Sequence, residues 1–398
     1  RRPTARDPVL LTGATGLVGI ELLARYLERT DRTVYALVRA KSARHADERM
    51  RETLESAFGT ADRFAGRVRA LAGDITRPGM GLDPAIAYDV GQAVTEIVHG
   101  AASVSFDMDL ETSREVNVEG TRELLEFAEF CRRHGGLRRF TYISTAYVAG
   151  EHRGAFTEDD LDVGQRFRNA YEQSKFEAEQ LVGGYRDRFP ITVARPSIIV
   201  GDSVTGWTSS FNVLYWPTRA LARGSYPVLP ARRRSPVDVV SVDYVADAVF
   251  ALTRSPDAAG GTYHLTASED ATSIGELLAI ACEQLECKAP PLISPRLYRR
   301  VIAPLMGRLQ PRRREFLRAT ATYVPYFAVR AHYDNARARR ALGPDGILPA
   351  PLGDYYARLI DYALLARWGG RPLTRAEAAE RVAGEATRAP QPATVVMT

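Results

Sequence analysis

Over its first two hundred residues, the sequence alternates short apolar runs with longer segments of helical periodicity. Continuous apolar runs are typical of buried parallel strands, and the segments between them supply the helices that cover the sheet. Between the fourth and fifth runs, Leu124, Ala128 and Cys131 fall on one face of a helix. The alternation therefore predicts an α/β fold with one doubly wound parallel sheet. The expected strands are Val9–Thr12, Thr33–Val38, Val68–Ala72, Ile97–His99, Phe140–Ser144 and Ile191–Arg195.

A glycine-rich turn follows the first expected strand and precedes a helical pattern. Gly13 permits the tight turn, Gly16 lets the backbone approach a pyrophosphate, and Gly19 lets the helix pack on the strand. The helix N-terminus adds unpaired N–H groups and a positive potential. We therefore predict a dinucleotide-binding sheet of the Rossmann type. The turn residues assigned to the cofactor are Thr12, Gly13, Thr15, Gly16, Leu17, Val18 and Gly19.

The end of the second strand indicates which dinucleotide binds. NAD-binding sites usually carry an acid there for the ribose 2′-hydroxyl, whereas this chain has Arg39, followed by Lys41 and Arg44. Because a 2′-phosphate would meet cations, we predict NADPH as the cofactor. After the third strand, Asp74 is placed to receive the adenine amino group, and Ile75 follows it.

A tyrosine and a lysine lie four residues apart in the helix expected over residues 168–185. An ammonium group beside the phenol of Tyr171 stabilises its phenolate, so the Tyr171 and Lys175 pair suits proton exchange with a carbonyl oxygen. Only three of the 53 basic residues are lysines, which indicates that a compact ammonium is required at this position. A hydroxyl partner is expected from Ser144 or Thr145, and spacing alone does not choose between them.

The chain is expected to have two parts and a tail. After Gly201 the alternation breaks into a stretch rich in Trp, Tyr and Pro, then resumes as a strand and helix over Pro236–Thr253 and a strand over Thr262–Thr266. We predict an NADP(H)-binding Rossmann domain over residues 1–203 and 236–266. A smaller, mostly helical substrate-binding lobe is predicted over residues 204–235 and 267–385, with a tail over residues 386–398.

Several of these segments together resemble the extended short-chain dehydrogenase/reductases, over residues 8 to about 270. The segments are Thr12–Gly19, Gly73-Asp74, Val116–Thr121 around Asn117, Ser144-Thr145 and Tyr171–Lys175. Within that superfamily, His99–Asp107 and Arg195–Gly201 are similar to the fatty acyl-CoA reductases. They are also similar to the thioester reductase domains that end carboxylic acid reductases and nonribosomal peptide synthetases.

The resemblance implies a site and a reaction. It assigns the hydroxyl role to Thr145 beside Tyr171 and Lys175, and it implies hydride delivery from NADPH to the carbonyl of an acyl thioester. The product would be an aldehyde, and sequence does not decide whether a second hydride gives the alcohol. Further cofactor contacts implied by the matching segments are Ala101, Ser103, Asn117, Pro196, Ser197 and Ile198.

Two other functions stay open at this point. One is an NAD(P)-dependent dehydrogenase or epimerase of sterols or nucleotide sugars, although the apolar and aromatic second lobe disfavours a sugar. The other is a non-catalytic dinucleotide-sensing protein, which would have no need of an intact Tyr171 and Lys175 pair.

Residues 291–340 carry twelve arginines against Glu315 and Asp334, a local charge of +10. We expect an anionic partner there, either acyl-CoA or an acyl carrier protein bearing phosphopantetheine. A solvated, Arg-rich surface is the alternative. No nucleic-acid partner is expected, because no recognisable nucleic-acid-binding motif accompanies the charge.

An apolar stripe recurs at helical spacing near that basic segment. Such a stripe usually packs on its own domain, but an acyl-channel wall and a peripheral contact with a membrane surface stay open. A homodimer also stays open, because members of the resembling family often pair through helices on the sheet. The stripe comprises Leu297, Val301, Ile302, Leu305, Met306 and Leu309, with Phe316, Tyr323, Tyr326 and Phe327 nearby.

The composition limits where we expect the protein to reside and which kinds of site it can hold. No apolar stretch approaches the roughly 18 to 20 residues that cross a bilayer, so we expect a cytoplasmic protein. Three cysteines are too few for a disulfide scaffold, and none lies in a zinc-binding pattern, so no metal site is expected. The chain does not begin with Met, so we expect a trimmed protein or a piece of a longer polypeptide.

Overall fold

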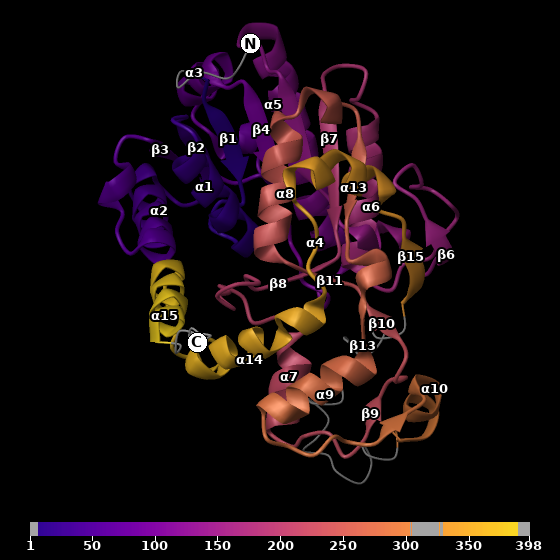
Figure 1. Ribbon diagram of the computed structural model, residues 1–398. Helices are drawn as coiled ribbons and strands as arrows, with labels where there is room; N and C mark the ends of the chain where they lie inside the picture. The colour runs from indigo at the N-terminus through magenta and orange to yellow at the C-terminus, as the bar shows by residue number, and fades with distance from the viewer. Residues whose placement is uncertain (1–6, 303, 305–325, 327–328, 389–398) are drawn as a thin grey trace, which may run out of the picture.

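A seven-stranded, wholly parallel sheet lies at the centre of the computed structural model, which describes residues 7–302, 304, 326 and 329–388. The strand order is β12-β7-β5-β4-β1-β2-β3 (Figure 1). The strands are β1 (Val9–Thr12), β2 (Val34–Arg39), β3 (Val68–Gly73), β4 (Glu96–His99), β5 (Arg139–Ile143), β7 (Ile191–Pro196) and β12 (Thr262–Leu265). The six strands predicted for this sheet are confirmed, and the strand predicted over Thr262–Thr266 joins them as β12, all with bounds that differ by no more than one residue.

Strand register brings three chain segments to the same edge of the sheet. Thr12 of β1 pairs with His99 of β4, and His99 pairs with Tyr142 of β5. The carboxyl ends of parallel strands are where ligands bind in such folds. The glycine turn after β1 and the segment after β5 therefore leave the sheet on either side of the segment after β4.

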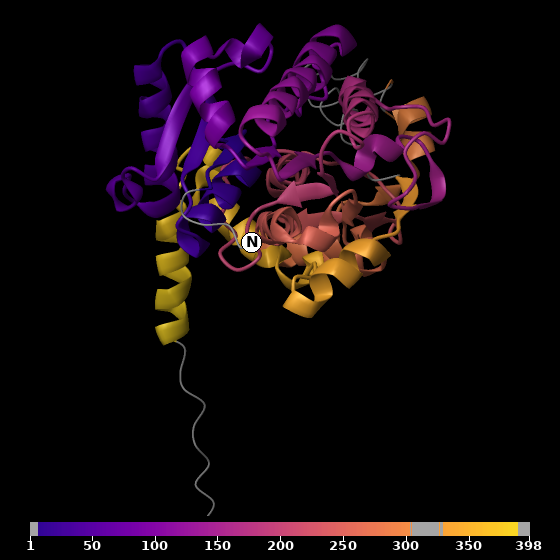
Figure 2. The same cartoon turned by 90° about the horizontal axis from the view of Figure 1, so that it is seen from above.

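Helices cover both faces of the sheet, as the view from above shows (Figure 2). Leu11 packs into the cluster that includes α1 (Leu17–Arg29) and α8 (Val242–Arg254), while Leu10 packs into the cluster that includes α5 (Gly120–His134). The predicted apolar face of α5 is confirmed, because Leu124, Ala128 and Cys131 are all fully buried. The fold is the predicted doubly wound α/β arrangement.

A second group of elements lies beyond the carboxyl edge of the sheet (Figure 1). The predicted strand after Pro236 is present, but it pairs outside the main sheet, because β11 lies beside β8. The elements are β8 (Ile198–Val200), α7 (Tyr215–Ala222), β9 (Leu229–Pro230), β10 (Pro236–Val237), β11 (Val239–Ser241), β13 (Thr272–Ser273), α9 (Ile274–Gln284), β14 (Leu292–Ile293) and α14 (Tyr356–Leu365).

Two later segments return to the sheet domain. β15 (Arg330–Tyr333) pairs with β6 (Arg153–Phe156), and α13 (Ala336–Leu342) contacts α8 and β12. Helix α15 (Arg375–Arg388), yellow in Figure 1, packs against α2 (Ala43–Phe58). The division of the chain into a Rossmann domain and a substrate lobe stays a prediction.

The apolar stripe of the basic segment is only partly described. Leu297 and Val301 are 50% and 49% exposed, so the expectation that the stripe packs on its own domain is wrong for these two residues. The cause is a π-helical turn over Tyr298–Ile302, which breaks the 3.6-residue period and turns Tyr298 inward instead. Leu305, Met306, Leu309, Phe316, Tyr323 and Phe327 lie outside the described residues.

The described helices are all too short or too polar to cross a membrane.

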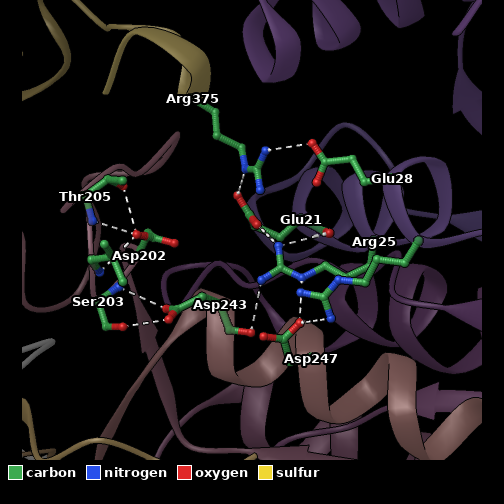
Figure 3. Close-up of polar contacts among 11 residues, drawn as sticks. Glu21, Arg25, Glu28, Asp202, Ser203, Thr205, Asp243, Asp247 and Arg375 are labelled. Atoms are coloured by element: carbon green, nitrogen blue, oxygen red, sulfur yellow. Dashed lines mark hydrogen bonds and ion pairs between the residues drawn. The ribbon is translucent and has the colours of Figure 1, made fainter. Parts of the chain in front are cut away.

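An ion-pair network ties the helix after the glycine turn to distant parts of the chain (Figure 3). Glu21 of α1 is fully buried and pairs with Arg25 and with Nε of Arg375 in α15, the latter at 2.7 Å. Arg25 also pairs with Asp247 of α8 at 2.9 Å. One turn earlier in α8, Asp243 accepts hydrogen bonds from the backbone N–H and hydroxyl of Ser203. Glu21 therefore joins α1, α8 and the C-terminal helix.

Replacing Arg25 by Met should destabilise the protein far more than replacing its neighbour Arg29. Arg25 is 5% exposed, and its loss leaves Glu21 with a single cation, a change that typically costs about 3 kcal/mol. Arg29 pairs with the same Asp247 but is 50% exposed, so Arg29→Met should cost less than about 1 kcal/mol. Thermal unfolding midpoints of the two variants measure the difference, and equal midpoints would contradict this account of the network.

Candidate active site

The glycine turn fits a bound pyrophosphate. Gly13 has a φ of +76°, and a Cβ there would lie 2.8 Å from the backbone nitrogen of Ala101; a Cβ on Gly19 would lie 1.9 Å from the carbonyl oxygen of Gly13. Gly16 is exposed, and a Cβ there would meet no protein atom nearer than 3.4 Å. Helix α1 begins after Gly16 with no side-chain cap and no acid in its first turn, which suits an anion. Thr15, Leu17 and Val18 are half-buried around this opening.

The residues predicted to bind the adenosine end lie beside one another after β2 and β3. Arg39 ends β2, and Arg39, Lys41 and Arg44 are all exposed ahead of or within the first turn of α2. Arg44 pairs with Glu48 at 2.8 Å. Across the β2–β3 pair, Asp74 accepts hydrogen bonds from the backbone N–H and hydroxyl of Thr76. The next residue, Ile75, is buried against Gly120, so its side chain belongs to the core.

Tyr171 and Lys175 lie on one face of α6 (Ala170–Gly183), as predicted. Asn169 caps this helix by accepting a hydrogen bond from the backbone N–H of Glu172. The structure separates the two hydroxyl candidates: Thr145 faces Tyr171 and lowers its pKa, whereas Ser144 donates to Glu179 on the far side of the strand end. The hydroxyl beside the phenol is therefore that of Thr145.

Burial shifts both members of the pair toward their neutral forms. Desolvation raises the pKa of Tyr171 to about 12, an effect that the hydrogen bond with Thr145 partly offsets. Desolvation also lowers the pKa of Lys175 to about 7, against the opposing charge of Glu179. At neutral pH the phenol therefore carries its proton and can donate it.

The Lys175 ammonium is held by strand β5. Its Nζ donates to the hydroxyl of Tyr142 at 2.7 Å and to the carbonyl oxygen of Ile143 at 2.8 Å. Lys175 itself is 3% exposed. Both acceptors belong to the strand whose end carries Thr145, so the ammonium is fixed relative to the hydroxyl and the phenol.

Asn117 links the segment after β4 to the catalytic helix. It lies in a π-helical turn over Glu115–Glu119, a feature that often marks functional sites. Its amide exchanges hydrogen bonds with the backbone of Ser103 and donates to the hydroxyl of Ser174, which in turn donates to the carbonyl of Tyr171. Asn117 therefore orients the first turn of α6 against the 100–103 segment.

The segment after β7 lies on the other side of Thr145. The carbonyl oxygen of Pro196 accepts a hydrogen bond from the Thr145 hydroxyl at 3.4 Å. Ser197 and Ile198 are buried next to it, and Ser197 N–H donates to Leu265 of β12. The structure thus brings predicted residues from the ends of several strands to one edge of the sheet.

Aromatic residues beside Tyr171 include one that sequence reasoning passed over. Phe106 lies with its ring centroid 5.6 Å from that of Tyr171 and stacks on Tyr326 at 4.9 Å. The hydroxyl of Tyr326 accepts a hydrogen bond from Asn169, the cap of α6. Tyr326 was noted only as one of several aromatic residues, and Phe106 only as part of the 99–107 segment, where its place next to Tyr171 had no local signal.

The fold and this site define an NAD(P)-binding protein of the extended short-chain dehydrogenase/reductase class. Residues 11–249, more than half of the chain, match the family described as "Male sterility protein". The chain belongs to this family.

The chain is similar to parts of much longer proteins. It is 37% identical over 219 residues to an isonitrile lipopeptide synthase of Streptomyces coeruleorubidus, covering 54% of this chain and 14% of that protein. It is 31% identical over 277 residues to the L-2-aminoadipate reductase large subunit of Penicillium chrysogenum, covering 65% of this chain and 19% of that protein. The chain thus spans less than a fifth of the length of either relative.

Solved structures extend the comparison to nearly the whole chain. The terminal R domain of the myxalamid PKS-NRPS pathway is 26% identical with a TM-score of 0.80, covering 92% of each chain. The reductase domain of a nonribosomal peptide synthetase from Mycobacterium tuberculosis is 25% identical with a TM-score of 0.69, covering 92% of this chain and 94% of that one. The chain is an NAD(P)-dependent reductase of the thioester reductase type, and the predicted resemblance to those domains is confirmed.

Alanine at two of the turn glycines should separate binding from folding. Gly16→Ala should leave the thermal midpoint close to that of the native protein, because a Cβ there meets no close protein atom, yet weaken dinucleotide binding about tenfold or more by obstructing the pyrophosphate. Gly19→Ala should lower the midpoint as well, because its Cβ overlaps the Gly13 carbonyl. Fluorescence titration with NADPH and a thermal melt measure the two effects; unchanged affinity in Gly16→Ala would contradict the assignment of the turn.

Proposed function

We propose that this chain reduces an acyl thioester to an aldehyde with NADPH, using Thr145, Tyr171 and Lys175. The observation that carries the proposal is a protonated phenol that faces Thr145 and lies one helical turn from a buried ammonium, at the sheet edge that also carries a turn fit for a pyrophosphate. The similarity to the terminal R domain of the myxalamid pathway supports a thioester as the substrate class.

The residues have distinct roles in this reaction. Bound NADPH supplies a hydride to the thioester carbonyl carbon. Tyr171 donates its proton to the carbonyl oxygen as negative charge develops there, and Thr145 adds a second hydrogen bond. Lys175 stabilises the resulting tyrosinate through its positive charge. The hemithioacetal then breaks its C–S bond, releasing the thiol and the aldehyde, and a second hydride would give the alcohol.

The aromatic pair beside Tyr171 offers an apolar wall to the acyl group. Phe106 and Tyr326 come from different parts of the chain, and their rings stack with an interplanar angle of 13°. An apolar wall next to the proton donor favours an acyl chain over a sugar. It also excludes water from the carbonyl, which strengthens the hydrogen bonds that stabilise the oxyanion.

Exposed arginines on the second group of elements support an acyl carrier protein, or coenzyme A, as the carrier of the thioester. Arg232, Arg233 and Arg234 follow β9, and β9 pairs with β14, which leads to Arg296 and Arg299. All five side chains are exposed, so the segments after the paired strands β9 and β14 both carry positive charge at the surface. An acidic protein face or a phosphate would be attracted there. Arg312, Arg313 and Arg314 lie outside the described residues, and membrane contact and a homodimer stay predictions.

Turnover tests the proposal and its alternatives together. NADPH oxidation is followed with an acyl carrier thioester, an acyl-CoA, a nucleotide sugar and a sterol, using the native chain, Tyr171→Phe and the control Tyr88→Phe. We expect turnover with thioesters only, a fall of at least about a hundredfold in Tyr171→Phe, and no change in Tyr88→Phe, whose ring is exposed. Turnover of the sugar or sterol alone, or tight NADPH binding with no turnover, would overturn it.

Cofactor choice is tested at the end of β2. Arg39→Ser combined with Lys41→Ser removes two cations that we assign to the 2′-phosphate. The KM for NADPH should rise about tenfold or more, while that for NADH stays within about twofold, because NADH carries no phosphate there. Arg133→Ser, an exposed arginine at the end of α5, is the control. A native chain with a lower KM for NADH than for NADPH would contradict the assignment of these cations to the 2′-phosphate.

A further inference from the structure

A buried row of polar side chains runs beneath the catalytic lysine. It comprises Thr12 of β1, His99 of β4, Tyr142 of β5, Asn117 of the π-helical turn before α5, and Thr121 of α5, each no more than 2% exposed. None of these contacts is needed to form the sheet, whose strands are already joined by backbone hydrogen bonds. Buried polar groups that are fully paired give a site a single arrangement.

The protons of this row can be placed by counting donors. The single hydroxyl proton of Thr121 goes to the carbonyl oxygen of Asn117 at 2.6 Å. His99 Nε2, 3.1 Å from the Thr121 oxygen, must therefore carry a proton and donate it. Burial lowers the pKa of His99 to about 3, so the ring is neutral and its Nδ1 accepts from the Thr12 hydroxyl at 2.8 Å. Thr12 in turn accepts from the backbone N–H of Ala101.

The same counting fixes the direction of the contact with the lysine. An ammonium only donates, so the hydroxyl oxygen of Tyr142 accepts from Lys175 at 2.7 Å. The hydrogen bond therefore leads from helix α6 to strand β5, with the Tyr142 oxygen as the acceptor.

This arrangement leaves the ammonium one donor for the site. Of its three N–H groups, one is held by Tyr142 and one by the carbonyl oxygen of Ile143. The third is the one that can face the phenol of Tyr171 or a cofactor hydroxyl.

We propose that Tyr142 is a positioning residue of the reduction. Its hydroxyl holds the Lys175 ammonium in its charged, oriented form. The inference rests on the proposed function for the role of Lys175, but the contact itself is testable without any substrate.

The charges that face Lys175 determine the expected pH behaviour. Its own helix contributes Tyr171 and Glu179, and Glu179 also pairs with Arg195 of β7 at 2.6 Å. Strand β4 contributes His99, which stays neutral across the working range. Removing the Tyr142 hydroxyl withdraws an acceptor from the ammonium and changes none of these charges. The pKa of Lys175 should therefore fall. As the pH is raised, activity that needs the ammonium should then be lost at a lower pH than in the native chain.

The experiment uses the fact that the chain has only three lysines. Full-length protein labelled with [ε-¹³C]lysine is titrated by NMR, and the signals are assigned with Lys41→Arg and Lys288→Arg. In Tyr142→Phe we expect the pKa of Lys175 to fall by about one unit, the size expected for losing a hydrogen bond to a charged group. The control is Tyr26→Phe, a fully buried tyrosine whose hydroxyl lies 3.5 Å from Glu96, away from the site. It should leave the Lys175 titration unchanged.

Activity provides the second readout. The alkaline limb of the pH profile of kcat should move to lower pH in Tyr142→Phe by the same amount as the titration, a change that a purely structural role would not produce. If Tyr142→Phe leaves both the pKa of Lys175 and the alkaline limb of the kcat profile unchanged, the proposal is overturned. If the native chain reduces no thioester but the titration shifts, the proposed function fails and the Tyr142 contact stands.

A second pair of variants at the same position keeps the proposal testable if Tyr142→Phe does not fold. Tyr142→Leu removes the hydroxyl, and Tyr142→Gln returns a side-chain acceptor. We expect the lower Lys175 pKa in Tyr142→Leu and a pKa nearer the native value in Tyr142→Gln. Identical titrations in the two variants would count against the contact.

Discussion

A single buried ammonium places a strong constraint on this site. An unpaired charge in the interior is costly, so Lys175 needs acceptors, and the parallel sheet provides them where β5 ends. The same register brings the glycine turn after β1 and the 100–103 segment after β4 to that edge. The chemistry we propose depends on this convergence, because the phenol of Tyr171 gains its partner only where these strand ends meet.

Polar residues at the strand ends divide into two sets with different roles. Ser144 joins Glu179 and Arg195 in a buried ion pair that connects α6, β5 and β7, whereas Thr145 faces Tyr171. Adjacent residues thus serve opposite faces of the same strand end. The first set fixes the helix that carries the catalytic pair, and the second meets the substrate in the proposed reaction.

Much of the fold could be predicted because its signals are local. Apolar runs gave every strand of the main sheet to within one residue, and the four-residue spacing placed Tyr171 and Lys175 on one helix face. Contacts between distant segments left no such signal: nothing near Arg375 indicates that it pairs with Glu21, and Tyr142 read only as one residue of an apolar strand. The stripe at Leu297 and Val301 was misjudged because a π-helical turn changes the period.

The central claim is that hydride passes from the reduced cofactor to a thioester carbonyl beside Tyr171. The most direct test incubates the chain with an acyl thioester and NADPH deuterated at the transferred C4 position, and traps the product for mass spectrometry. The account predicts an aldehyde carrying one deuterium on its carbonyl carbon, together with one equivalent of free thiol. An aldehyde without deuterium, or thiol release that needs no reduced cofactor, would contradict it.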